Sequence, residues 1–309
     1  AQARAPSRAR ARGRRTGIGA PADVSSHAVS LPRRLARLVR LEHTVFALPF
    51  AYVGALLAAD GWPGWGPMAW VTLAMAGART LAMGLNRLVD AELDLRNPRT
   101  AGRELPSGAL SRLQVRLLCA AALGAYLLAV FRLDPVVRWL WPIPVALFVA
   151  YPYLKRFTWL CHLWLGACLG LAPIGAWLAV AGAAPWEAWV LGAAVALWVA
   201  GFDLFYALLD LEHDRAVGLH SWATRFGIDG AFRGARVLHL GTVVLLALAG
   251  WGLDRGVWYG IGVAAVAVLL LYEHLIVRPT DLRRLDAAFF TVNGLVSVGF
   301  GLCVALDAL

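Results

Sequence analysis

Two rows of polar residues carry the clearest chemical signal in this sequence. The first row is Asn86, Asp90 and Asp94, spaced by four residues within GLNRLVDAELDLRNPRTAGRELPSG. At about 100° per residue these positions drift by only about 80° around a helix, so their oxygens share one face. The second row lies within GFDLFYALLDLEHDRAVGLHS, and its spacing also places its members on one helical stripe. This second row comprises Asp203, Tyr206, Asp210 and Asp214.

The ligand types in the two rows favour magnesium. Carboxylate and amide oxygens are hard ligands of the kind Mg²⁺ prefers, whereas metals that favour thiolate or imidazole match poorly. Two acidic faces that point at each other repel unless cations lie between them. We therefore expect a Mg²⁺ site held by Asn86, Asp90, Asp94, Asp203, Asp210 and Asp214.

Basic residues gather beside both rows. Magnesium in proteins commonly binds one or two carboxylates together with substrate phosphates, and guanidinium groups recognise phosphate oxygens. Acids for a metal beside bases for phosphate predict a metal-bridged diphosphate site. The bases are Arg87, Arg99 and Arg103 near the first row, Lys155 and Arg156 between the rows, and Arg215 near the second.

Other interpretations of these residues remain open at this point. A single Asp near a helix end is often a solvated charge paired with an arginine, although two matched rows favour a site. A transporter that binds cations through these acids is a second alternative, and flux without a covalent product would support it. The scattered histidines, His162 among them, and the four cysteines are expected to be core or interface residues.

The composition places the chain in a membrane. It has 309 residues, 60% of them hydrophobic and 16% charged, with a mean hydropathy of +0.64. A soluble domain averages about 45–50% apolar and about 25% charged residues. The chain is therefore expected to be an all-α polytopic membrane protein, and a disordered chain or a disulfide scaffold is excluded.

Nine apolar segments are long enough to be candidate spans. Gly166 and Gly170 in the fifth form a GxxxG step that favours close helix packing. Residues 30–40 form a short amphipathic lead-in to the first span. The expected spans are residues 42–59, 67–89, 113–131, 136–153, 160–181, 186–209, 236–251, 256–273 and 287–306.

The charge pattern predicts the orientation. Residues 1–40 hold ten arginines and one acid, which predicts a basic disordered tail over 1–30 or a transit peptide, followed by a membrane domain over 31–309. Nucleic-acid binding is not expected. With a cytoplasmic N-terminus, the loops on that side hold fourteen further bases and the opposite loops hold three. Because cytoplasmic loops are enriched in Lys and Arg, both acidic rows are expected to face the cytoplasm.

The two rows resemble the motifs of the UbiA superfamily of intramembrane aromatic prenyltransferases. The motif NDxxDxxxD is matched at Asn86, Asp90 and Asp94, with Arg87 in place of the common Asp that directly follows Asn. The motif DxxYxxxDxxxD is matched by the second row, and His220 stands where many members have Lys. The similarity covers about residues 35–305. The family's basic loops are matched by Arg99, Arg103, Pro106, Ser107, Gly108, Tyr151, Lys155 and Arg156.

The resemblance implies nine helices around a central cavity, with a polyprenyl tail leaving through a lateral opening into lipid. It also implies that Asp90, Asp94, Asp203 and Asp210 are catalytic through Mg²⁺ bound to a polyprenyl diphosphate. Arg40 matches a basic position that the family places near the aromatic acid. The substrate-binding residues that the resemblance implies are Arg40, Asn86, Arg99, Arg103, Lys155, Arg156 and Tyr206.

The phrases RNPRTAGRELPSG, KRFTWLCHLWLG and GLHS are most similar to bacterial members of the 4-hydroxybenzoate polyprenyltransferase type. These include enzymes of the alternative menaquinone route, which prenylate a dihydroxynaphthoate. Both acceptors are hydroxy-aromatic carboxylic acids, so quinone biosynthesis is implied either way. A haem- or chlorophyll-prenylating relative is the alternative within the family. We expect a protein of the bacterial cytoplasmic membrane without an obligate protein partner.

Overall fold

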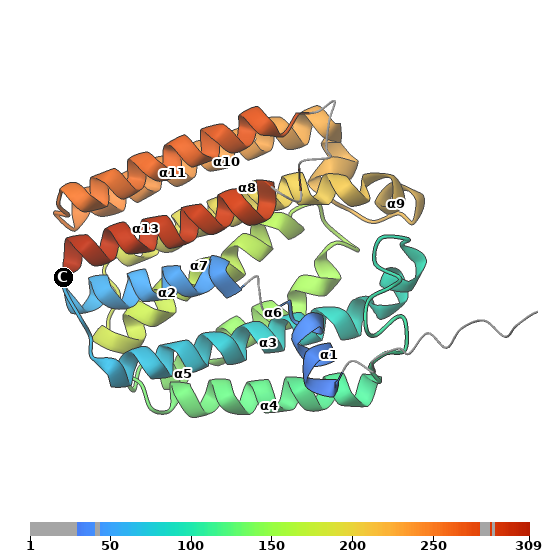
Figure 1. Ribbon diagram of the computed structural model, residues 1–309, viewed down its shortest axis with the longest axis horizontal. Coiled ribbons are helices and arrows are strands. Elements are labelled where there is room, and N and C mark those ends of the chain that lie inside the picture. The colour runs from blue at the N-terminus through green and yellow to red at the C-terminus, as the bar shows by residue number, and fades with distance from the viewer. Residues whose placement is uncertain (1–29, 41–43, 279–284, 286–287) are drawn as a thin grey trace, which may run out of the picture.

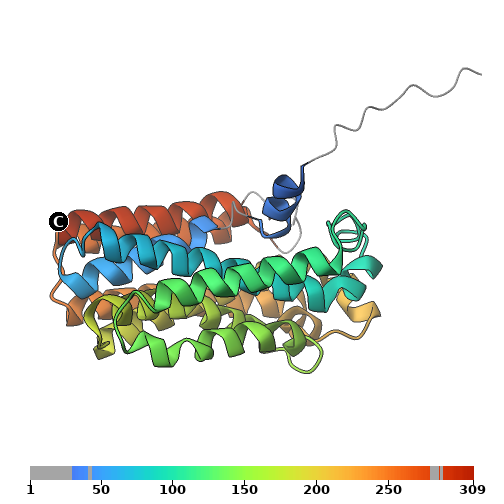
Figure 2. The same cartoon turned by 90° about the horizontal axis from the view of Figure 1, so that it is seen from below.

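A computed structural model describes residues 30–40, 44–278, 285 and 288–309. The long helices lie side by side along one axis of the molecule (Figures 1 and 2). The expected disordered tail over 1–30 falls almost wholly outside the described residues. The described helices are α1 (Leu31–Leu38), α2 (Thr44–Ala59), α3 (Trp65–Arg96), α4 (Arg112–Val130), α5 (Val137–Leu140), α6 (Pro142–Leu154), α7 (Cys161–Ala181), α8 (Trp186–Tyr206), η2 (Ala207–Asp210), α9 (Leu211–Ala216), α10 (Trp222–Gly252), α11 (Val257–Ile276), η3 (Ala288–Val292) and α13 (Asn293–Ala308).

Seven of the described helices are long and apolar enough to cross a membrane, so the expectation of nine spans is met in part. The two remaining candidates are shorter. The first is α2, with 16 residues. The second, expected over 136–153, is divided into α5 and α6 at Pro142, the first residue of α6. Proline has no backbone N–H to donate to the preceding turn, so it interrupts a helix and suits the start of a new one.

Two helices extend well beyond the apolar segments expected for them. The segment expected over 67–89 continues as α3 to Arg96, so the whole first polar row is helical. The segment expected over 236–251 begins as α10 at Trp222, where Ser221 and Thr224 form a capping box. Gly227, with φ of 72°, interrupts the helical backbone there. The apolar segments therefore mark the membrane-crossing parts of these helices but not their polar ends; the polar end of α3 was indicated by the spacing of the first row.

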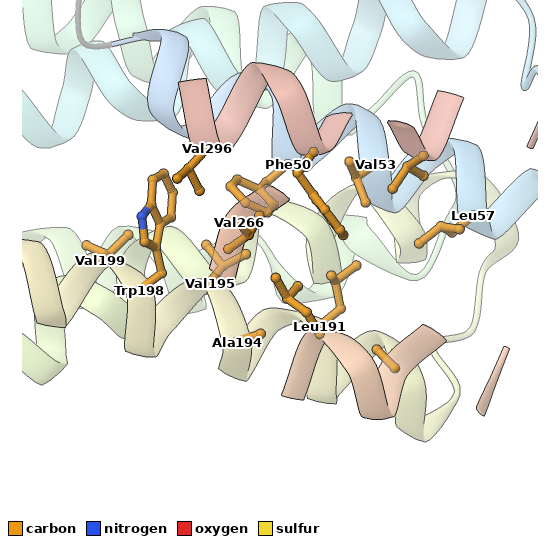
Figure 3. Packing of buried hydrophobic residues seen from close by; sticks show 14 of the residues in the cluster. Phe50, Val53, Leu57, Leu191, Ala194, Val195, Trp198, Val199, Val266 and Val296 are labelled. Carbon is orange, nitrogen blue, oxygen red and sulfur yellow. The ribbon is translucent and has the colours of Figure 1, made fainter. Parts of the chain in front are cut away.

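Close helix packing holds α7 against α8. A side chain at Gly166 would place its Cβ 2.2 Å from the Ala196 carbonyl oxygen, and one at Gly170 would lie 2.5 Å from that of Gly192. Only glycine permits this approach, which confirms the expected use of the GxxxG step. On its other side α8 packs against α10. Figure 3 shows Leu191, Val195 and Trp198 of α8 among buried side chains from α2, α11 and α13.

The helices close into one bundle because α13 packs against α2 as well as α11. Within the first half of the chain, α3 packs against α4 and α6, and α2 packs against α7. A cavity lined by residues of α2, α3, α4, α5, α6, α7 and α8 lies between these helices. This arrangement places the ends of α3 and α8, which carry the two polar rows, on the wall of the same space.

Candidate active site

The two polar rows meet in a single cavity of about 850 Å³. All seven members of the rows line it, Asp94 and Asp203 included. Arg99, Arg103 and Lys155 line it as well. The structure thus brings together acids and bases from segments more than a hundred residues apart in the sequence.

In the first row, each Asp has a basic partner from a different segment. Lys155 Nζ lies 2.6 Å from Asp90 Oδ2, and the Asn86 amide also donates to that oxygen at 3.1 Å. Arg103 Nη1 lies 2.7 Å from Asp94 Oδ1. Asp90 and Asp94 are both buried, and buried carboxylates require such partners. The loops after α3 and α6 are thereby held against the polar face of α3.

The second row does not follow one continuous α-helix as expected. Asp203 and Tyr206 belong to α8, but Asp210 ends the 3₁₀ turn η2 and Asp214 lies in the short helix α9. A 3₁₀ turn has about three residues per turn, so it changes the direction of the side chains that follow. All four residues still line the cavity.

Asp210 joins the second row directly to the loop that follows the first. Its Oδ1 accepts hydrogen bonds from Asn97 Nδ2 and Arg99 Nε, both at 2.8 Å, and its Oδ2 contacts Arg99 Nη2. Arg99 Nη1 donates to the Tyr206 hydroxyl at 3.1 Å. Burial alone lowers the pKa of Arg99, but the hydrogen bonds and negative charge of Asp210 outweigh it and raise that pKa above its ordinary value. Arg99 is therefore a permanent cation at this junction.

Asn97 is a residue of this site that the spacing argument missed. It is buried, lines the cavity, and accepts the Arg99 backbone N–H at its Oδ1 while donating to Asp210. Its position just beyond α3 lies outside the four-residue spacing of the first row. The one feature of the sequence that could have indicated Asn97 is that this amide residue comes just before the basic loop.

His162 is the second missed residue. Its Nδ1 lies 2.7 Å from Asp203 Oδ2, and the buried ring lines the cavity. From the sequence, the histidines were expected in the core or at the membrane interface. His162 stands at the start of α7, 41 residues before Asp203, and only the close packing of α7 on α8 brings the two together.

Further guanidinium groups line the wall beside the first row. Arg40, expected near an aromatic acid, lines the cavity, and its carbonyl oxygen accepts from Arg79 Nη2 at 3.2 Å. Arg79 also lines the cavity, seven residues before Asn86 and so about 10 Å deeper along α3. Arg87 lines it too, 3.9 Å from Asp94 Oδ2. This wall can attract an anion.

The structure also places Arg156 and His220, two basic positions noted in the sequence. Arg156 does not line this cavity; it lines a second pocket and reaches Asp90 Oδ1 at 3.4 Å from there. His220, at the position where a Lys is common, lines the cavity, and its backbone N–H donates to the Lys155 carbonyl at 2.7 Å. Lys155 is therefore fixed at both its backbone and its side chain.

The donor chemistry of the cavity suits Mg²⁺. Asp94 Oδ2 is buried and accepts no hydrogen bond from any described residue, with Arg87 Nη1 3.9 Å away, so this carboxylate oxygen can serve as a ligand. Among the described residues, no three His, Cys, Asp or Glu side chains gather closely enough to hold a metal by themselves. Magnesium commonly uses only one or two carboxylates, completed by waters and substrate phosphates. The residues therefore fit a metal that is bound together with a phosphorylated substrate.

The rest of the cavity lining is mostly apolar. The lining runs along α3 from Asp94 to Val71, a distance of about 35 Å at the helical rise. Ala74, Met75 and Ala78 lie between, and Trp141 faces the same space. A cavity with charged residues toward one end and hydrocarbon toward the other fits a ligand with a charged head and an apolar chain.

Comparisons with known proteins agree with this arrangement. Residues 47–295 match the model of the UbiA prenyltransferase family. The 4-hydroxybenzoate octaprenyltransferase of Aromatoleum aromaticum is 32% identical over 289 residues, covering 91% of this chain and 95% of the relative. The enzyme of that name from Escherichia fergusonii is 32% identical over 264 residues, which cover 83% of this chain and 89% of the relative.

Two solved structures share the fold. The apo structure of a UbiA homologue from Aeropyrum pernix K1 is 32% identical, with a TM-score of 0.80, and covers 87% of this chain and 99% of that one. A UbiA homologue from Archaeoglobus fulgidus bound to GPP and Mg²⁺ is 19% identical, with a TM-score of 0.69. The match covers 88% of this chain and 99% of that one.

Proposed function

The chain belongs to the UbiA prenyltransferase family and is a prenyltransferase, and we propose that it transfers a polyprenyl group from a polyprenyl diphosphate to the ring of a hydroxy-aromatic carboxylic acid. One observation carries the proposal. Two acidic rows and their basic partners meet toward one end of a cavity whose lining is mostly apolar. The charged end suits the diphosphate, and the apolar length suits the prenyl chain.

The acids of the two rows would hold Mg²⁺, which when bound neutralises the diphosphate and makes it a better leaving group. The ligands we propose are Asn86, Asp90, Asp94, Asp203, Asp210 and Asp214. The bases now paired with these acids lie close enough to bind phosphate oxygens instead. Those bases are Arg99, Arg103 and Lys155, with Tyr206 beside Arg99.

Transfer breaks the bond between the allylic carbon and the diphosphate oxygen and forms a carbon–carbon bond ortho to the ring hydroxyl. The ring carbon loses a proton, which a nearby carboxylate or the departing diphosphate accepts. The apolar walls that contain Phe148 and Phe202 keep water from the allylic cation. Arg40 and Arg79 supply positive charge for the substrate carboxylate.

The named relatives favour 4-hydroxybenzoate as acceptor, and a dihydroxynaphthoate has the same recognition groups. Either places the protein in quinone biosynthesis. We further propose that the site faces the cytoplasm from a bacterial inner membrane, because the basic loops lie at its end of the bundle.

The test is an assay of purified protein in vesicles with a polyprenyl diphosphate, Mg²⁺ and each acceptor in turn, read by product mass. The added mass identifies both the acceptor and the chain length. D90N and D210N should lose nearly all turnover, whereas D229N, on an exposed face of α10, should retain it. Absence of product with both acceptors, or full activity of D90N, would contradict the proposal.

A further inference from the structure

A second pocket lies beside α3, and none of the three first-row residues, Asn86, Asp90 and Asp94, lines it. It has a volume of about 230 Å³ and is lined mainly by α3, with one residue from α4 and one from the segment after α6. Its charged residues are Arg96, Arg112, Arg156 and Glu92. Three arginines against one acid give the pocket a net positive charge.

The charge of this pocket is poorly neutralised by the protein itself. Within the described part of the chain, Arg96 has no ion-pair partner. Arg112 lies 3.6 Å from Glu92, but both side chains are more than half exposed, and such pairs contribute little. Arg112 is also the first residue of α4, so the positive end of that helix dipole lies at the pocket. An anion in this pocket would be attracted by the three arginines and by the positive end of the α4 dipole.

Three exposed leucines lie close in the sequence to two of the pocket's arginines. Leu95 precedes Arg96 on α3, Leu113 follows Arg112 on α4, and Leu117 lies one turn further. Each is about 60% exposed. Both helices are long and apolar enough to cross a membrane. Exposed leucines on such helices face lipid chains, whereas arginines at the helix ends reach the level of the headgroups.

We propose that this pocket binds the phosphate of an anionic phospholipid through Arg96, Arg112 and Arg156, while its acyl chains lie against the exposed leucines. Basic pockets between helices at a membrane surface recognise anionic headgroups. The leucines explain why a lipid, rather than a soluble anion, is the occupant.

A lipid bound to Arg156 would also affect Asp90 of the first row, because Arg156 contacts Asp90. Arg156 Nη2 lies 3.4 Å from Asp90 Oδ1 and 3.2 Å from the Val89 carbonyl oxygen. A headgroup phosphate bound to Arg156 competes with Asp90 for that guanidinium. Occupancy of the pocket therefore changes how strongly Asp90 is paired.

The experiment is native mass spectrometry of the full chain released from micelles that contain phosphatidylglycerol or phosphatidylcholine. We expect retention of phosphatidylglycerol, and R96Q/R112Q should weaken it about thirtyfold, at roughly 1 kcal/mol per arginine. R233Q/R236Q removes the same charge from exposed positions of α10 and should leave retention unchanged. Millimolar inorganic phosphate should not displace the lipid.

Three outcomes would overturn the proposal: equal weakening by both double variants, equal retention of the two lipids, or displacement by inorganic phosphate, which would identify a site for free anions. Melting temperature and prenyl transfer in phosphatidylcholine vesicles should match wild type for R96Q/R112Q. If that variant does not fold, R96Q alone decides, with about fivefold weaker retention expected. Unchanged retention by folded R96Q would count against the site.

Discussion

Asn97 offers a sharp test of how the two halves of the site are joined. Its amide donates to Asp210 at 2.8 Å and accepts the Arg99 backbone N–H at 2.9 Å. In N97D the side chain keeps its size and can still accept from Arg99. It loses the donor, however, and places a second carboxylate against Asp210. In N97A both hydrogen bonds disappear without an added charge.

The expected order of activity follows from these contacts. A lost hydrogen bond to a charged group costs about 1.5–3 kcal/mol, so N97A should lower kcat/KM about ten- to a hundredfold. Two carboxylates about 4 Å apart repel by roughly 4 kcal/mol at an effective dielectric of 20. Even after relaxation, N97D should therefore be at least about tenfold less active than N97A.

The assay is prenyl transfer from a radiolabelled diphosphate, with thermal unfolding as the control for folding. If Asn97 were only a loop-capping residue, N97D would be the milder change because it preserves the bond to Arg99. Activity of N97D equal to or above that of N97A would refute the account of this junction.

Three other predictions follow from the structure. H162A removes the 2.7 Å partner of Asp203 and should lower kcat/KM about tenfold; unchanged kinetics would show that the contact is incidental. G166A forces a Cβ to within 2.2 Å of the Ala196 carbonyl and should destabilise the fold by about 1–3 kcal/mol, seen as a lower melting temperature. G175A, on the same helix with open space at its Cβ, is the matched control and should melt at or slightly above the wild-type temperature. EDTA should abolish transfer and Mg²⁺ should restore it, whereas activity that persists in EDTA would exclude the metal.

Regular spacing made one part of the site predictable from the sequence. Asn86, Asp90 and Asp94 lie on α3 as expected, because the helix continues past its apolar segment. The second row was predicted as one helical stripe, but the turn at η2 interrupts it before Asp214. Helical periodicity indicates which residues share a face only while the helix is unbroken.

Contacts between distant segments were beyond the sequence analysis. The partner of Asp203 depends on how α7 packs against α8, and that packing depends on glycines whose spacing was noted only as structural. The family resemblance implied that Arg156 binds substrate together with Lys155, yet the two residues line different pockets. Adjacent residues at a helix end point in different directions, and only the tertiary structure decides which one faces the cavity.

Calorimetric titration of geranyl diphosphate into wild type, D94N, D203N and the double variant, with and without Mg²⁺, tests most directly whether the two acidic rows bind one ligand together. The account predicts that binding depends on Mg²⁺ and that each single variant weakens it. The loss of binding free energy in the double variant should be smaller than the sum of the two single losses, because both acids act on the same ligand. Binding by D203N equal to that of wild type, or binding indifferent to Mg²⁺, would contradict it.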